Sequence, residues 1–168
     1  RVWYINHKFP SNSILGGGSV TAGAAQLRLA ITDRLQLVAY KDGYLDFDSG
    51  LTKDDGWADV AAGLKYAVVQ DFKSNFHWAI GAGYEFPWGD KSVLMNDAEA
   101  RVWTSLDKGW DKFHLGGTFN YYWATTDRDV DFGNSDYCSW HLHMDYRVTD
   151  WFSPVVEVHG YHALVTSD

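Results

Sequence analysis

Residues 57–70 read Trp-Ala-Asp-Val-Ala-Ala-Gly-Leu-Lys-Tyr-Ala-Val-Val-Gln, and their side chains fall into two alternating sets. One set holds Ala58, Val60, Ala62, Leu64, Tyr66 and Val68, and the other holds Asp59, Ala61, Gly63, Lys65 and Ala67. Successive side chains of a β-strand point to opposite faces, so each set lies on one face. The stretch therefore predicts a long strand with one uncharged, largely apolar face.

The same alternation recurs along the whole chain, while helical spacing is nearly absent. It predicts nine strands, at residues 1–7, 19–32, 35–44, 57–70, 75–86, 97–107, 113–126, 137–149 and 151–164. Tight turns near residues 33, 73, 110 and 150 are roughly 40 residues apart, which indicates a repeat of long hairpins. We expect a single domain over residues 1–168: an all-β, antiparallel, up-and-down transmembrane β-barrel with every tight turn at one end.

Two registers follow from the hairpin turns. Across the turn at Asp33, Leu29 should lie beside Leu37 and Arg28 beside Val38; across the turn at Asp150, His141 should lie beside His159 and His143 beside Glu157. Both pairings keep the apolar side chains on one face, as antiparallel pairing requires.

The composition excludes several classes of protein. Aromatic residues make up 17% of the 168 residues, too many for a disordered chain. A single cysteine excludes a disulfide scaffold, and a net charge of −8 without a basic run argues against nucleic acid as a partner. The apolar runs are too short for a transmembrane helix, but a membrane β-barrel hides its apolar residues at alternate positions.

Long alternating strands, tight turns containing Asp and long polar loops resemble a Gram-negative outer-membrane β-barrel. Residues 55–66 are similar to strands of porin-like outer-membrane proteins, including those linked to aromatic-compound degradation. The resemblance implies a protein of the bacterial outer membrane that acts as a channel or passive transporter for small solutes. It transfers no functional residue to this chain.

In such a barrel the apolar face meets lipid, because an Arg or Lys at the lipid midplane costs about 2–4 kcal/mol. The expected lumen-lining residues are Arg28, Asp59, Lys65, His77, Glu85, Glu99, Arg101, His114, His141, His143, Asp145, Arg147, Glu157 and His159. The expected partners are outer-membrane lipid, lipopolysaccharide and small solutes. Aromatic residues near the strand ends, among them Trp57, Trp88, Trp103, Trp110, Tyr137 and Trp151, would form girdles at the headgroup level.

Two patterns on the polar face suit more specific chemistry. His141, His143, Glu157 and His159 combine imidazole and carboxylate groups that suit zinc, nickel or copper, although a plain row of polar lumen side chains explains them as well. Ser139 with His141, or Ser105 with His114, could serve a lipid-modifying enzyme, but no nucleophile elbow accompanies them. We expect a protein that is not an enzyme and needs no cofactor.

Two other classes of protein fit the same alternation. A soluble lipocalin-like barrel would turn the apolar face inward around a small ligand, and a structural or adhesive barrel would use its loops to bind a partner. The acidic connections 43–56 and 127–136 suit cation bridging to lipopolysaccharide, cation attraction at a pore mouth, or ordinary solvated loops.

The expected strand number is odd, whereas bacterial single-chain barrels have even numbers of strands. An open sheet edge leaves backbone groups without partners in lipid, so the native wall should close. We expect this chain to be part of a larger barrel of about ten to twelve strands or more, with an eight-stranded barrel as the alternative.

Overall fold

The computed structural model describes residues 2–13, 16–93, 96–126 and 135–164. Its strands are β1 (Val2–Phe9), β2 (Gly18–Ala25), β3 (Leu27–Ala30), β4 (Leu35–Lys41), β5 (Tyr44–Ser49), β6 (Asp55–Trp57), β7 (Val60–Asp71), β8 (Phe76–Phe86), β9 (Glu99–Trp110), β10 (Phe113–Ala124), β11 (Tyr137–Tyr146) and β12 (Val155–Ala163). Within the described residues, the one helical element is the short 3-10 turn η1 (Lys91–Val93). The all-β, antiparallel prediction is confirmed.

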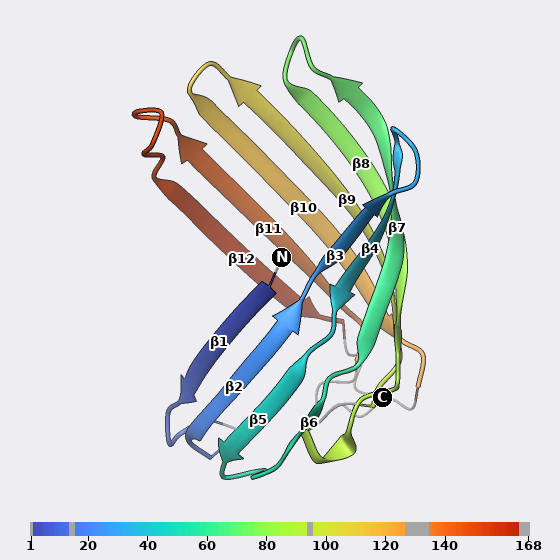
Figure 1. The fold of residues 1–168 in the computed structure, drawn as a ribbon, viewed down its shortest axis with the longest axis vertical. Helices are drawn as coiled ribbons and strands as arrows, with labels where there is room; N and C mark the ends of the chain where they lie inside the picture. The colour runs from blue at the N-terminus through green and yellow to red at the C-terminus, as the bar shows by residue number, and fades with distance from the viewer. Residues whose placement is uncertain (1, 14–15, 94–95, 127–134, 165–168) are drawn as a thin grey trace.

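The strands form two sheets. Most paired strands are consecutive in the chain, whereas β2 pairs with β5 and β4 with β7. One sheet has the order β1-β2-β5-β6 and the other the order β12-β11-β10-β9-β8-β7-β4-β3. The turns near residues 33, 73, 110 and 150 lie at the upper end in Figure 1, as the hairpin repeat predicts, and the short connection between β5 and β6 lies at the lower end. Strands β7, β9 and β10 each have 12 residues, enough for the 9–11 that a membrane strand needs.

Twelve strands are observed where nine are predicted. The predicted strand 19–32 is interrupted and gives β2 and β3, while β5 and β6 fall almost wholly within the predicted connection 43–56. Strands β2 and β3 are separated at Gln26, β4 and β5 at Asp42 and Gly43, and β6 and β7 at Ala58 and Asp59. Gly43 has a φ of +141°, and a Cβ there would lie 2.6 Å from the carbonyl oxygen of Gly23. Glycine therefore permits the bend at which the two sheets diverge.

Both predicted registers are confirmed. Arg28 pairs with Val38 and Leu29 with Leu37, while His141 pairs with His159 and His143 with Glu157. Three sequence expectations are wrong. Residues 43–56 are not simply a loop, since they hold β5 and β6, and β9 continues through the predicted turn at 107–112 to Trp110. A β-bulge between Ala67 and Val69 also interrupts the predicted alternation of residues 57–70.

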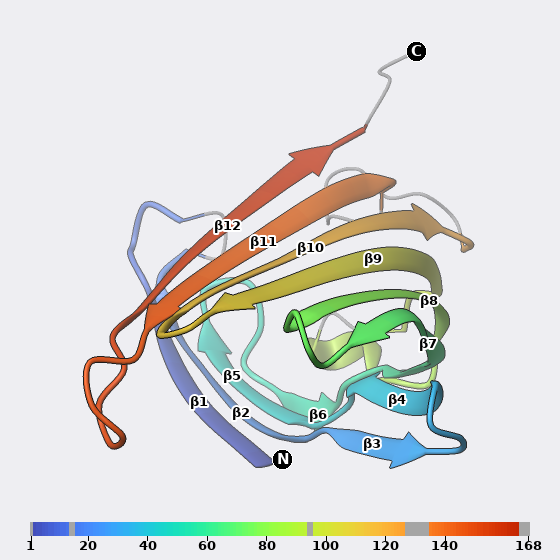
Figure 2. The same cartoon turned by 90° about the horizontal axis from the view of Figure 1, so that it is seen from above.

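The wall curls round but is open. Figure 2, seen from above, shows β12 running outward on one side and β1 on the other. Within the described residues no ladder of backbone hydrogen bonds joins β1 to β12. Closure of the predicted barrel therefore stays a prediction.

Apolar side chains cover the convex face of the curl. Exposed apolar side chains occupy the outward positions of five neighbouring strands. They are Val60, Leu64 and Tyr66 on β7; Trp78 and Ile80 on β8; Val102 and Leu106 on β9; Leu115, Phe119 and Tyr121 on β10; and Trp140, Leu142 and Met144 on β11. Near the strand ends Trp57, Phe72, Trp88, Trp110 and Trp151 are exposed as well. Trp103 and Tyr137 are exceptions to the predicted girdles, since both lie on the concave side.

Few apolar side chains are buried. Val38, Ala61 and Ala79 lie on the concave side of the sheet, and Ala58, Val93 and Ala98 pack around the connection between β8 and β9. The burial of Ala58 differs from its expected place on the outward apolar face. Most of the large apolar side chains named above therefore cover the outside of the wall instead of filling a core.

Among the described residues no helix has the length and apolar character needed to cross a membrane.

Candidate functional site

The concave face is polar and is the side on which side chains from distant strands meet. Tyr40 on β4 and Trp103 on β9 lie with ring centroids 6.0 Å apart, although β7 and β8 separate their strands. A Cβ at Gly81 would overlap the Trp103 ring, and one at Gly83 would lie 2.7 Å from the Tyr40 hydroxyl oxygen. The glycines let two large rings lie flat against the wall, so this part of the interior is filled.

Arg101 occupies the centre of this aromatic group. Its guanidinium carbon lies 4.8 Å from the ring centroids of Tyr40 and Trp103 and 5.1 Å from that of Tyr122. Its Nη2 donates a 2.5 Å hydrogen bond to the Oδ1 of Asn120. Cation–π contact and hydrogen bonding together hold a positive charge at the middle of the concave face. We call these residues the Arg101 group.

A chain of polar contacts continues from Asn120 to the last strand. The Asn120 Nδ2 donates to the Ser139 Oγ at 2.9 Å, and this oxygen lies 3.1 Å from the His141 Nε2. The His141 Nδ1 lies 2.7 Å from the His159 Nδ1, and the His159 Nε2 lies 3.7 Å from Glu157. Ser139 is fully buried, so the predicted Ser139–His141 contact exists but its hydroxyl faces no open space for a substrate.

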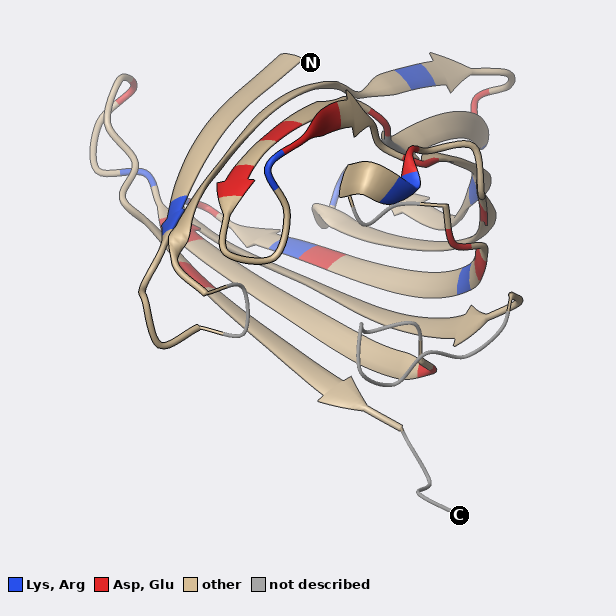
Figure 3. Ribbon diagram, turned by 90° about the horizontal axis from the view of Figure 1, so that it is seen from below, with Lys and Arg blue, Asp and Glu red and all other residues tan. Residues whose placement is uncertain are grey.

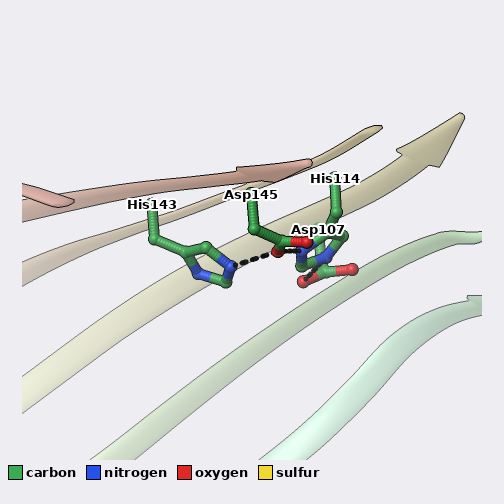
Figure 4. Close-up of polar contacts among 4 residues, drawn as sticks. All are labelled: Asp107, His114, His143 and Asp145. Carbon is green, nitrogen blue, oxygen red and sulfur yellow. Dashed lines mark hydrogen bonds and ion pairs between the residues drawn. The ribbon is translucent and has the colours of Figure 1, made fainter. Parts of the chain in front are cut away.

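A second polar group lies nearer the tight turns and consists of Asp107, His114, His143 and Asp145 (Figure 4). The His114 Nε2 lies 2.8 Å from Asp107 and its Nδ1 lies 2.8 Å from Asp145. The His143 Nε2 lies 3.2 Å from the same Asp145 oxygen. Three strands, β9, β10 and β11, contribute to this group, which we call the His114 group.

The four-residue metal candidate predicted from sequence is therefore not one cluster. His141, His159 and Glu157 remain together, but His143 turns toward Asp145 and His114. The register between β11 and β12 is as expected, with His143 opposite Glu157. The His143 side chain nevertheless contacts Asp145, two residues along its own strand. His114, His143 and Asp145 place their ligand atoms within 4.8 Å of one another.

Several cavities lie along the concave face of the described residues. One of about 320 Å³ is bordered by Lys65, His77, His141, His143, Glu157 and His159, and a smaller one of about 190 Å³ by Arg28, Lys65 and Arg101. A third, of about 320 Å³, is bordered by His77, His114, Asp145 and Arg147. These residues are all among those expected to line a lumen, and the structure brings them to one face.

One residue expected on this face, Asp59, has other surroundings, whereas Glu85 and Glu99 keep the inward alternation of their strands. Asp59 is 1% exposed, and its carboxylate accepts hydrogen bonds from the backbone N–H groups of Gly89, Asn96 and Asp97. It anchors the connection after β8, so its expected role as a lumen-lining residue is wrong. Glu85 is buried on β8 and pairs in register with Glu99 on β9.

Acidic residues also gather on β5 and β6 at the end away from the tight turns (Figure 3). They include Asp46 and Asp48 on β5 and Asp55 on β6. The Lys53 Nζ lies 3.4 Å from the Asp48 carboxylate, and this ion pair is exposed. The predicted acidic connection at 43–56 is thus a hairpin. Residues 127–134 of the other acidic connection lie outside the described residues.

The sequence did not single out Asp107, Asn120, Tyr40 or Trp103 as site residues. Asp107 was placed in a turn, although its alternation with Ser105 on β9 could have extended that strand. Alternation with Arg101 places Trp103, and alternation with Val38 places Tyr40, on the inward face, so the position of the two rings could have been predicted.

The sequence pattern of a family described as "Putative MetA-pathway of phenol degradation" matches residues 7–168. The chain belongs to this phenol-degradation family. The match runs from β1 into the last residues, so both polar groups and the whole apolar face lie within it. The predicted resemblance to proteins linked to aromatic-compound degradation is thus supported at the level of the family. No curated protein and no solved structure matches the sequence.

Proposed function

We propose that the chain forms the wall of an outer-membrane β-barrel, which acts as a porin-like channel or passive transporter for small solutes. The observation that carries this proposal is the exposed apolar face. Leu64 is 47% exposed, Phe119 48% and Leu142 49%, and each lies on a different strand of the same sheet. Soluble monomers rarely expose a contiguous apolar patch of such extent, whereas lipid requires one.

The charged cavities of the concave face support the proposal of a channel. It carries cavities bordered by charged residues of both signs, including Lys65, Glu157 and Arg101. Charges in a membrane protein are placed where they meet water or each other, because lipid excludes them. An aqueous path along this face would be narrowed at the Arg101 group, where the rings of Tyr40 and Trp103 fill the space.

The family description supports a proposal for the chemical class of the solute. Because the family is described by phenol degradation, we propose small aromatic compounds such as phenol as the transported solutes. The rings around Arg101 offer apolar faces beside a positive charge, which suits an aromatic solute carrying a hydroxyl or carboxylate. Contact with lipopolysaccharide at the acidic β5–β6 end stays a prediction.

Planar-bilayer recording of the purified full-length protein tests the proposal. We expect discrete conductance steps in potassium chloride and a concentration-dependent reduction of the current by benzoate, which should compete for the Arg101 region. Acetate at the same concentration is the control and should reduce the current less. A protein that dissolves without detergent and never inserts into bilayers would instead support the soluble ligand-binding barrel.

A further inference from the structure

We propose that His114, His143 and Asp145 bind a divalent transition-metal ion such as Zn²⁺ on the concave face. The ligands would be the Nδ1 of His114, the Nε2 of His143 and an Oδ of Asp145. Two imidazoles and one carboxylate form a set that zinc sites use when a fourth position stays open for water or a solute. The proposal does not rest on channel function, because a soluble barrel would present the same three residues.

The strand register brings the ligands together. His114 on β10 lies directly opposite Asp145 on β11, and His143 lies two positions earlier on the same face of β11. The partner of His143 on β10 is Gly116, and a Cβ there would lie 3.2 Å from the His143 Nδ1. Glycine at this position leaves room for the imidazole to lean toward His114, and the two ring centroids are 4.9 Å apart.

The distances suit one ion after a small movement. Asp145 lies 2.8 Å from the His114 Nδ1 and 3.2 Å from the His143 Nε2. Ligand atoms around a tetrahedral zinc ion with bonds near 2.1 Å stand about 3.4 Å apart. The two distances to Asp145 therefore need to open by less than about an ångström, and the three ligand atoms already lie within 4.8 Å of one another.

Asp107 completes the arrangement from β9. It lies 2.8 Å from the His114 Nε2, the ring nitrogen that the ion would not use. A metal-bound histidine commonly donates its second N–H to a carboxylate, which fixes the ring orientation and strengthens the metal bond. We assign Asp107 as a positioning residue and not as a ligand.

The site is open to an ion from the interior. The side chains of His114, His143 and Asp145 are 30%, 39% and 25% exposed. Lys112 and Arg147 border the same cavity, so their positive charges compete for Asp145 and should limit the affinity. By contrast, the paired Nδ1 atoms of His141 and His159 lie 2.7 Å apart and already satisfy each other, which makes these residues the natural control.

Isothermal titration calorimetry of the tag-free protein in detergent with Zn²⁺ tests the proposal. Titration with Co²⁺ adds a spectroscopic measurement of the same site. The wild type should bind one equivalent, and bound Co²⁺ should give the visible absorption of a four-coordinate ion. His143→Ala and Asp145→Asn should each weaken binding at least tenfold. Asp107→Asn should weaken it by about 10- to 100-fold through loss of the ring orientation.

Two further variants keep the test decisive. His143→Gln retains a polar side chain if His143→Ala does not fold, and far-ultraviolet circular dichroism checks that each variant keeps its strands. His141→Ala combined with His159→Ala should bind zinc as the wild type does. The proposal is overturned if the wild type binds no zinc, if His143→Gln and Asp145→Asn bind it normally, or if the His141/His159 double variant loses it.

Discussion

The two faces of β11 differ in the polarity, charge and hydrogen bonding of their side chains. Outward lie Trp140, Leu142 and Met144, which are 40%, 49% and 40% exposed and carry no charge. Inward lie Ser139, His141, His143 and Asp145, each of which makes a hydrogen bond or ion pair with another polar side chain of the concave face. Adjacent residues on one strand therefore meet different media, and the same contrast extends along β7 to β10.

This contrast shows what alternation determines. It decides which face a residue occupies and, in the proposed membrane barrel, whether lipid or polar groups surround it. It does not decide how much space lies in front of the residue: the Arg101 group, with its rings over glycine, borders a cavity of about 190 Å³, while the His114 group borders one of about 320 Å³. Those differences depend on the residues that neighbouring strands bring.

The largest expected effect separates the two faces directly. Leu142→Arg places a charge on the outward face and should destabilise the membrane-inserted protein by about 2–4 kcal/mol. His143→Arg, one residue away, should cost far less because its side chain faces the polar interior. Urea unfolding in lipid vesicles measures both. Equal losses would break the contrast between the faces.

Replacing glycines on the two faces by leucine compares how tightly each face is packed. Gly81→Leu on the concave face would overlap the Trp103 ring, and overpacking of this kind costs about 1–3 kcal/mol. Gly117→Leu on the convex face meets the flexible end of the Leu142 side chain at 3.1 Å and should change stability by less than about 0.5 kcal/mol. Heat-modifiable gel mobility after folding into detergent provides the comparison.

A smaller effect concerns permeation. Arg101→Gln removes the positive charge at the narrow part of the concave face, so it should shift ion selectivity toward cations without abolishing conductance. The reversal potential in a potassium chloride gradient reports this shift. Arg34→Gln, in the tight turn between β3 and β4, should leave the reversal potential unchanged; an equal shift in both variants would argue against an interior position for Arg101.

The smallest effect concerns Asp71, the last residue of β7, beside the tight turn. Hydrogen bonds from the Ser74 hydroxyl, then from the backbone N–H groups of Ser74 and Lys73, hold the pKa of Asp71 below its usual value. A depressed pKa adds stability that is present above the unfolded-state value and is lost as the pH falls through the folded-state value. Ser74→Ala should move the pKa of Asp71 back up, and Ser74→Thr should not. Carboxyl carbon NMR titration distinguishes them.

Much of the fold could be predicted because short turns fix register. The pairs Arg28 with Val38 and His143 with Glu157 follow from the positions of two turns. The β5–β6 hairpin was missed because residues 43–56 are rich in Asp and Gly, which are typical of loops. The β-bulge near Val68 was missed because two adjacent valines are compatible with either face.

The His114 group was only partly predictable for a related reason. His143 and Asp145 share a face by alternation, but the partner strand β10 is reached through a long connection that sets no register. The pairing of His114 with Asp145 is therefore visible only in the structure. The sequence grouped His143 with the strand whose register was known, which is β12.

Cysteine labelling tests the central claim, that the concave face meets water and the convex face meets lipid. In a Cys138→Ala background, Leu142→Cys and His143→Cys are placed singly in the protein reconstituted into vesicles, and each is exposed to a membrane-impermeant maleimide. Thr118→Cys and Phe119→Cys repeat the comparison on β10. The account predicts rapid labelling at 118 and 143 and protection at 119 and 142. Labelling at 119 and 142 with protection at 118 and 143 would contradict it.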